Sequence, residues 1–133
     1  MQEIALKTDR KTQLVNITEL VQSALGDPNG AAAALVYVPH TTAGVAINER
    51  IDPDLVDDLE NAFQKVVGDD WPWKHEDADG PNAPSHARAS LASSPQVLIP
   101  LRDGRLGLGT YQGIFFCEFD GPRERKVYVT PLA

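Results

Sequence analysis

The residues of this chain best suited to chemistry are its three histidines, His40, His75 and His86. All three stand in polar segments rather than in apolar periodic ones. A neutral imidazole is a common metal ligand, and three of them leave a fourth position open, as a catalytic zinc ion requires. Their spacing matches no local ligand motif, so the residues alone leave two interpretations open. Either the three rings share a metal ion, or each is a separate surface or hydrogen-bonded histidine.

Two carboxylate residues, Glu49 and Glu118, have no obvious structural role. Glu49 follows an alternating segment, where it is available to orient a histidine or to bind a hard cation. Glu118 stands in GIFFCEF, where an extended chain places it among apolar neighbours. Because a buried carboxylate is costly unless paired or protonated, Glu118 lies near an open strand end or is held for a purpose. Arg123 and Arg125 are natural partners for it, or ligands for a phosphate group.

The stretch HTTAG offers a further feature beside His40. Thr41 and Thr42 are followed by a small residue and a glycine, a pattern that lets backbone N–H groups approach an anion. The same pattern suits a simple turn between two strands. Both interpretations stand at the level of sequence.

Composition narrows the class of protein. The chain has 133 residues, which predicts one domain over residues 1–133. Its net charge of −7 and its pI of about 4.8 argue against nucleic acid and anionic membranes as partners, but leave room for a small anionic substrate. The single cysteine, Cys117, excludes an intrachain disulfide and is expected to lie in the core. We see no apolar leader and no membrane-spanning run, so a cytoplasmic location is expected.

The elements that must position these residues can be predicted from periodicity and caps. Helices are predicted over 16–26, over 54–67 after Asp52 and Pro53, and from Pro84 or Ser85 through SHARASLA. Strands are predicted at 2–8, 32–38, 43–49, 96–101, 105–112, 113–119 and 124–130. Short turns between consecutive strands favour antiparallel pairing. We therefore expect a compact α+β domain with a mostly antiparallel sheet and about three helices.

Three long segments resemble a known family. HTTAGVAINERIDPDLVDDL, NAPSHARASL and IPLRDGRLGLGTYQGIFFCEFDGPRERKV resemble the YjbQ family in the same order, so the likeness covers nearly the whole chain. Members of that family are described as secondary thiamine-phosphate synthases. The resemblance implies a compact α+β protomer that assembles as a homotrimer, with a site near a subunit boundary built around histidines and acids.

Carried over residue by residue, the resemblance places all three histidines on motif positions. It therefore implies a shared site for a divalent metal, and three imidazoles favour zinc over magnesium. The implied metal ligands are His40, His75 and His86, and the implied catalytic residues are Glu49, Asn82 and Glu118. The implied contacts to a small phosphorylated substrate are Thr41, Thr42, Arg88, Tyr111, Gln112 and Arg123. Tyr111 replaces the usual Trp of the family, which keeps a flat but smaller aromatic face.

Three functions follow, and the residues do not decide between them. The first is the joining of a pyrimidine pyrophosphate to a thiazole phosphate with release of pyrophosphate, which needs cations around the leaving group. The second is a metal-dependent hydrolase of a small anionic ester, with Glu49 or Glu118 as the base. If Glu118 is that base, its replacement by Gln should abolish turnover and leave folding largely intact. The third is a non-catalytic trimer that binds a metal or a small molecule.

Overall fold

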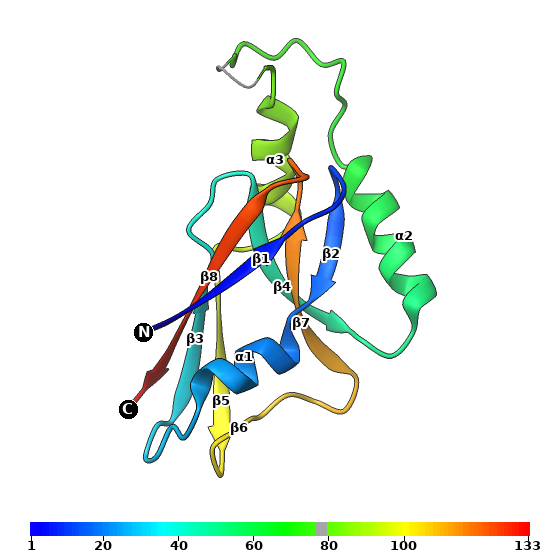
Figure 1. Cartoon of the computed structure of the whole chain (residues 1–133). Helices are drawn as coiled ribbons and strands as arrows, with labels where there is room; N and C mark the ends of the chain where they lie inside the picture. The colour runs from blue at the N-terminus through cyan, green and yellow to red at the C-terminus, as the bar shows by residue number, and fades with distance from the viewer. Residues whose placement is uncertain (77–79) are drawn as a thin grey trace.

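The computed structural model describes residues 1–76 and 80–133, and it has the α+β architecture that the sequence predicts. Helices α1 (Thr18–Leu25), α2 (Pro53–Gln64) and α3 (Ala83–Ala92) accompany two sheets (Figure 1). The first sheet has the order β1 (Gln2–Lys7), β8 (Glu124–Leu132), β3 (Ala33–Tyr37), β5 (Gln96–Arg102) and β6 (Arg105–Leu106). The second has the order β2 (Gln13–Asn16), β7 (Gln112–Glu118) and β4 (Ala43–Glu49). Every ladder between these strands is antiparallel, which confirms the predicted pairing.

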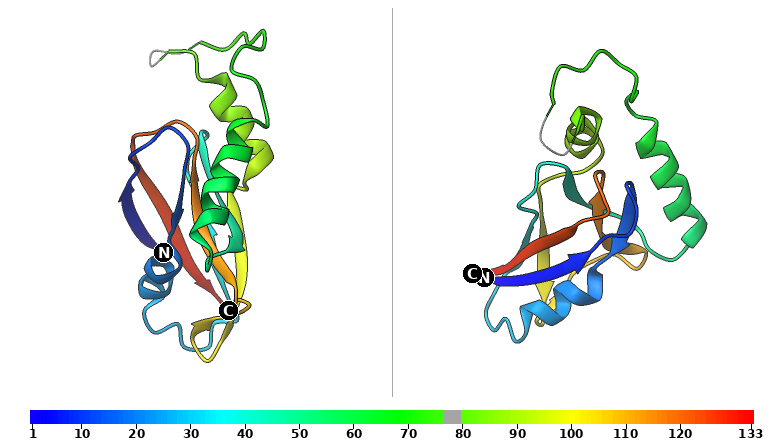
Figure 2. Two further views of the ribbon diagram at one scale, coloured as in Figure 1. Left: turned by 90° about the vertical axis from the view of Figure 1, so that its right-hand side faces the viewer. Right: turned by 45° about the horizontal axis from the view of Figure 1, so that its top comes forward.

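Strand β7 divides the core into two clusters. Ile114 and Phe116 face a cluster shared by both sheets and α1, whereas Phe115 and Cys117 face a second cluster formed with α2 and α3. Phe119, just past the strand, joins the second cluster. This alternation confirms the predicted faces of the strand, because successive side chains of a strand point to opposite sides. In Figure 2, α2 and α3 lie together on one side of the strands, and α1 lies apart from these two helices.

Helix α2 begins as its sequence predicts and ends earlier. The Asp52 carboxylate accepts a hydrogen bond from the Asp54 N–H at 2.9 Å, and Pro53 is the first helical residue. The prediction extended the helix to residue 67, but it ends at Gln64. The reason is the buried guanidinium of Arg88, which binds carbonyl oxygens at this end and replaces the next helical turn.

Two strand predictions differ from the structure. The predicted strand 105–112 is reduced to β6, because the chain turns away after residue 106 and Gly107 lies against the carbonyl of Pro100. The short strand β2 was not predicted, since four residues carry too little periodicity to be recognised. Within the described residues, no helix is long and apolar enough to cross a membrane.

The two ends of the molecule differ in what they carry. Helix α3 and the turn between β7 and β8 lie at one end, while the β5–β6 hairpin and loop 107–111 lie at the other (Figure 1). Strands β4 and β7 run between these ends side by side. Residues at opposite ends of this pair are therefore far apart.

Candidate functional site

A cavity of about 550 Å³ opens at the α3 end of the molecule. It is formed by the end of β3, the loop after it, the start of α3, the β7–β8 turn and β8. The residues that line it are Tyr37, Val38, Pro39, His40, Thr41, Thr42, Asn82, His86, Pro95, Asp120, Arg123 and Arg125. Two arginines and two histidines thus gather in one cavity of a chain whose net charge is −7.

Helix α3 presents two unsatisfied polar atoms to this cavity. Asn82 is the N-cap residue, and His86 stands four residues later, so both project from one face of the first turn. The Asn82 side-chain amide donates to the Asp120 carboxylate at 3.0 Å. Within the described residues, Asn82 Oδ1 and His86 Nε2 are buried without a hydrogen-bond partner. Buried polar atoms of this kind are rare without a ligand or water, so they mark a binding position.

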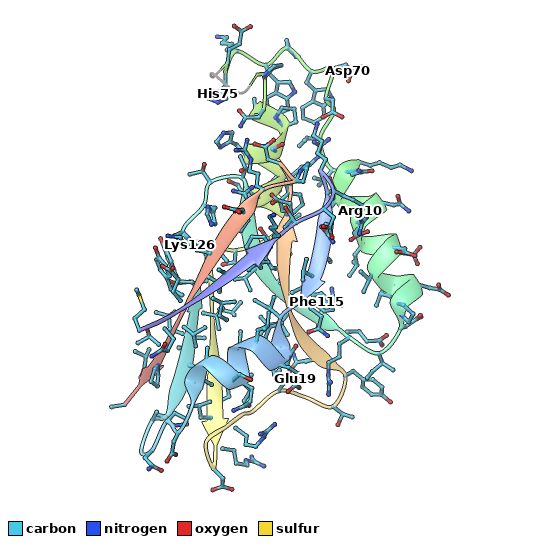
Figure 3. All side chains as sticks on the ribbon, viewed as in Figure 1. Arg10, Glu19, Asp70, His75, Phe115 and Lys126 are labelled. Carbon is cyan, nitrogen blue, oxygen red and sulfur yellow. The ribbon has the colours of Figure 1, made fainter. Side chains whose placement is uncertain are left out.

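His75 comes from the loop that precedes α3 and lies beside His86. The two imidazole rings meet edge to face with their centroids 5.0 Å apart. His75 is otherwise exposed at the tip of the molecule, as its label in Figure 3 shows. The loop therefore places one sequence-predicted metal ligand next to another.

His40 is engaged differently. Its Nε2 accepts a hydrogen bond from the Lys126 backbone N–H at 2.9 Å. Burial, together with the nearby positive charge of Arg125, lowers the pKa of His40, which favours the neutral ring. A neutral ring that accepts at Nε2 carries its proton on Nδ1, so it offers the cavity a donor. In this arrangement neither nitrogen of His40 presents a lone pair to a metal. Among residues 1–76 and 80–133, no three His, Cys, Asp or Glu side chains are grouped as metal ligands.

Glu118 is fully buried and pairs with Arg125, one of the residues that line the cavity, and all its acceptor positions are used. Its Oε1 accepts from Thr8 Oγ1 at 2.7 Å and from Arg125 Nε at 2.8 Å. Its Oε2 accepts from Arg125 Nη2 and from the Phe119 and Asp120 N–H groups, both at 3.0 Å. Burial alone would raise the pKa of this carboxyl, but these hydrogen bonds and the charge of Arg125 outweigh burial and lower it. Glu118 is thus a charged group that fixes Arg125.

The two arginines of the cavity are held in place by acidic partners. Arg125 is 6% exposed, and its Nη2 also donates to Thr42 Oγ1 at 2.9 Å. Arg123 Nη2 donates to the Asp120 carboxylate at 2.9 Å, and its Nε donates to the Asp120 carbonyl at 2.8 Å. Because both guanidiniums are pre-positioned, a phosphate group entering the cavity meets ordered donors rather than mobile ones.

Comparison with known proteins gives the family. The family model described as UPF0047 protein YjbQ-like matches residues 2–133. The chain belongs to the YjbQ-like UPF0047 family. The Bacillus subtilis protein YugU is 41% identical over 133 residues, which cover 97% of this chain and 96% of YugU. MJ1081 of Methanocaldococcus jannaschii is 41% identical over 125 residues, covering 93% and 88% of the two chains.

Solved structures of YjbQ-like proteins share the fold. An uncharacterized conserved protein of Clostridium acetobutylicum has a TM-score of 0.86 and 43% identity, over 99% of this chain and all of its own. The hypothetical protein APE1520 of Aeropyrum pernix has a TM-score of 0.88 and 39% identity, over 98% and 96% of the two chains. The α+β fold is therefore a property of the family.

In this YjbQ-like chain, three sequence-predicted site residues lie far from the cavity. The β4–β7 ladder pairs Ala43 with Glu118 at one end and Glu49 with Gln112 at the other. At about 3.4 Å per residue, strands of seven residues separate the two pairs by about 20 Å. Glu49, Tyr111 and Gln112 therefore lie at the opposite end of the protomer, and Tyr111 is 63% exposed there.

Arg88, which the resemblance implies as a substrate contact, lies outside this cavity. It is 2% exposed. Its guanidinium donates to the carbonyl oxygens of Gln64 and Val67 and to the carboxylate of Asp69. Arg88 thus satisfies the backbone at the end of α2 and ties α3 to it.

Tyr37 was not among the site residues predicted from the sequence. Tyr37 ends β3, lines the cavity and stacks on Tyr128 with ring centroids 6.5 Å apart. Its place three residues before His40, at the end of a predicted strand, was the available signal, since a strand that ends near a site residue brings its last side chains to that site. Tyr37, rather than Tyr111, is the aromatic wall of this cavity.

Proposed function

We propose that the cavity at the α3 end binds a small phosphorylated molecule, and that the chain is a thiamine-phosphate synthase-like transferase. The observation that carries the proposal is one cavity holding two ordered guanidiniums and two buried, unpartnered polar atoms. Guanidinium groups that are already positioned are suited to stabilise a departing pyrophosphate. Each guanidinium is paired with one carboxylate, so the two groups act as positioned hydrogen-bond donors and not as an excess of positive charge.

The reaction itself needs little covalent chemistry from the protein. The thiazole nitrogen uses its lone pair to form a bond to the methylene carbon of the pyrimidine, while the carbon–oxygen bond to pyrophosphate breaks and its electrons leave with the pyrophosphate. Arg123 and Arg125 would hold that leaving group by charge-assisted hydrogen bonds. Tyr37 offers a flat apolar face against which the pyrimidine can stack. Asn82 Oδ1 would accept a hydrogen bond from an amino group of the substrate.

The divalent metal implied by the family resemblance has partial support from the donor atoms. His86 Nε2 is buried and unpartnered, and His75 lies beside it, whereas His40 Nε2 is already occupied. His86 and His75 are therefore the residues proposed to hold the ion, and imidazole ligands favour zinc. A bound cation would add positive charge beside the pyrophosphate.

The hydrolase has less support than the transferase. It needs a free carboxylate near the bound ester to activate water, and Glu49 lies at the far end of the protomer. Glu118 is saturated by hydrogen bonds and inaccessible. Asp120 lines the cavity, but it already accepts from Asn82 and Arg123. The cavity therefore suits anion stabilisation better than base catalysis.

We propose that the protomers of a homotrimer contact one another through the outer face of the five-stranded sheet. Directly paired residues share a face, and Tyr37, Leu98 and Leu132 on this face are 40%, 62% and 38% exposed. Because Tyr37 also lines the cavity, a neighbouring protomer on this face would border the site. Light scattering should give three times 14.5 kDa for the wild type and a smaller mass for Leu98→Glu. Leu91→Glu, which changes an exposed leucine on α3, should leave the mass unchanged.

The transferase is tested by measuring pyrophosphate release from the two substrates in the presence of zinc or magnesium. Arg123→Gln should lower kcat by about 100-fold, the typical cost of removing one stabilising donor. Arg102→Gln, which removes an equal charge from exposed β5, should stay within about twofold of wild type. If the wild-type protein binds pyrophosphate but releases none from the two substrates, the chain is a binding module and not a transferase. If the wild-type protein also fails to bind pyrophosphate, the proposed site at the α3 end is rejected.

A further inference from the structure

A second cavity, of about 210 Å³, lies at the end of the protomer opposite the first. It is bordered by α1, by the residue after β4, by β6 and by loop 107–111. Its lining includes Glu19, Gln22, Arg50, Arg105, Thr110 and Gln112. Figure 3 shows Glu19 in the half of the molecule remote from His75. The two cavities share no lining residue, so what binds in one does not touch the other.

Arg50 is positioned by a glycine on the neighbouring strand. Its backbone N–H donates to the Tyr111 carbonyl at 2.8 Å. A Cβ at Gly113 would lie 2.8 Å from Arg50 Cβ, 3.1 Å from Arg50 Cδ and 3.2 Å from Thr18 Oγ1. The arginine stem therefore lies directly over the bare Cα of Gly113, which explains a glycine inside a buried strand. This packing fixes the direction of the side chain.

Arg105 is positioned by a glutamine on α1. Gln22 Oε1 accepts from the Leu106 N–H at 2.9 Å, and Gln22 Nε2 donates to the Gly104 carbonyl at 3.1 Å. These two bonds tie the backbone on both sides of Arg105 to the helix. Within the described residues, neither Arg50 nor Arg105 forms an ion pair. Two guanidiniums from different elements thus border one small cavity, and neither has an ion-pair partner within the described residues.

The remaining polar groups add hydrogen-bond donors. Gln112 Oε1 accepts from the Gly109 N–H at 2.8 Å, which leaves the amino group of Gln112 available to a ligand. Thr110 contributes a hydroxyl. Glu19 is the single carboxylate among the lining residues, so it offsets only part of the positive charge.

We propose that this second cavity binds the phosphate group of a small molecule. A phosphate monoester carries a charge of about −1.5 to −2 near neutral pH, which two guanidiniums can balance. The cavity is smaller than the roughly 300–1,000 Å³ of pockets that enclose a drug-sized ligand, so it takes the phosphate and leaves the rest of the ligand outside. This site is independent of the proposed transferase.

The test is a titration of the full chain with inorganic phosphate at constant ionic strength, followed by backbone amide NMR shifts. We expect shifts at Gly109, Thr110 and Gln112, distinct from any near His86 in the first cavity. Arg50→Gln and Arg105→Gln should each weaken phosphate binding about tenfold or more. Arg102→Gln, on the same hairpin but outside the cavity, should change binding less than twofold.

Gly113→Ala tests the positioning of Arg50 without removing any charge. It should weaken binding as Arg50→Gln does, provided that the amide spectrum shows a folded chain, and Arg50→Gln carries the test if it does not. Absence of shifts around residues 109–112 would overturn the proposal. Equal weakening by Arg102→Gln would show a general charge effect and overturn it too. Acetate that binds as tightly as phosphate would reject the assignment to phosphate.

Discussion

Replacing Glu118 by Gln should destabilise the fold, because it leaves the buried guanidinium of Arg125 without a counter-charge. Glu118 is 0% exposed and Arg125 is 6% exposed, so water cannot replace the lost interaction. The carboxylate accepts five hydrogen bonds, from Thr8, from the Phe119 and Asp120 N–H groups, and twice from Arg125. In glutamine, an NH₂ group must replace one of the two oxygens and then faces these donors with hydrogens of its own.

The size of the effect follows from the burial of both partners. Removing one member of a buried ion pair typically costs about 3–5 kcal/mol, because an uncompensated charge stays behind. We expect Glu118→Gln to lower the free energy of unfolding by about that amount, out of the roughly 5–15 kcal/mol usual for a domain. This replaces the expectation from sequence that folding would stay largely intact.

Urea denaturation followed by circular dichroism measures this free energy for wild type and variant under one buffer condition. Glu124→Gln on β8, beside Arg125, is the matched control, and because Glu124 is exposed it should change stability by less than about 0.5 kcal/mol. The double variant Glu118→Gln, Arg125→Met should recover most of the loss, since apolar groups can replace a buried pair. A Glu118→Gln variant within about 1 kcal/mol of wild type would contradict the role assigned to this pair.

The same pair predicts a pH dependence with a defined sign. The folded-state pKa of Glu118 is lowered, so its contribution to stability is complete above the ordinary carboxyl value of 4.5. The contribution is lost as the pH falls through the lower folded-state pKa. Wild type should therefore lose more stability than Glu118→Gln on acidification below pH 4.5. Parallel acid profiles for the two proteins would refute this.

Three further predictions concern single residues outside this pair. Arg88→Met should lower the free energy of unfolding by about 2–4 kcal/mol, because carbonyl groups at the end of α2 lose their hydrogen-bond donor. Pyrophosphate affinity should stay unchanged; denaturation measures the first quantity and calorimetry the second. A loss of affinity without a loss of stability would support the predicted substrate contact of Arg88. The His40 ring should titrate in NMR below its ordinary pKa of 6.5. Its contribution to folding stability is therefore full above pH 6.5 and falls as the pH drops below that value. A titration midpoint above 6.5 would contradict the partly buried position of the ring beside Arg125. Cys117 should resist thiol reagents until the protein unfolds, because burial excludes water and raises the pKa of its thiol to about 12; rapid labelling of the native protein would disagree.

Local patterns in the sequence predicted the elements that local rules determine. The alternation on β7 and the start of α2 at Asp52 and Pro53 were predicted because side-chain period and helix capping act over a few residues. The division into two sheets and the strand β2 were not predicted, since they depend on pairings between distant segments. The early end of α2 depends on Arg88, a contact that no local pattern reveals.

The candidate site was predictable only in part for the same reason. Asn82 and His86 lie together because Asn82 is the N-cap of α3 and His86 stands in its first turn, whereas the sequence predicted this helix only from Pro84 or Ser85. Glu49 and Gln112 lie elsewhere because β4 and β7 run antiparallel, and their register carries these residues to the far end. A motif that is continuous in sequence can thus contribute to two different ends of a sheet.

The central claim, that the cavity at the α3 end binds a phosphorylated ligand, is tested most directly by a crystal structure of the protein grown with inorganic pyrophosphate. Phosphoryl oxygens should lie within hydrogen-bond distance of the guanidiniums of Arg123 and Arg125. A cavity that holds only water at saturating pyrophosphate would contradict it.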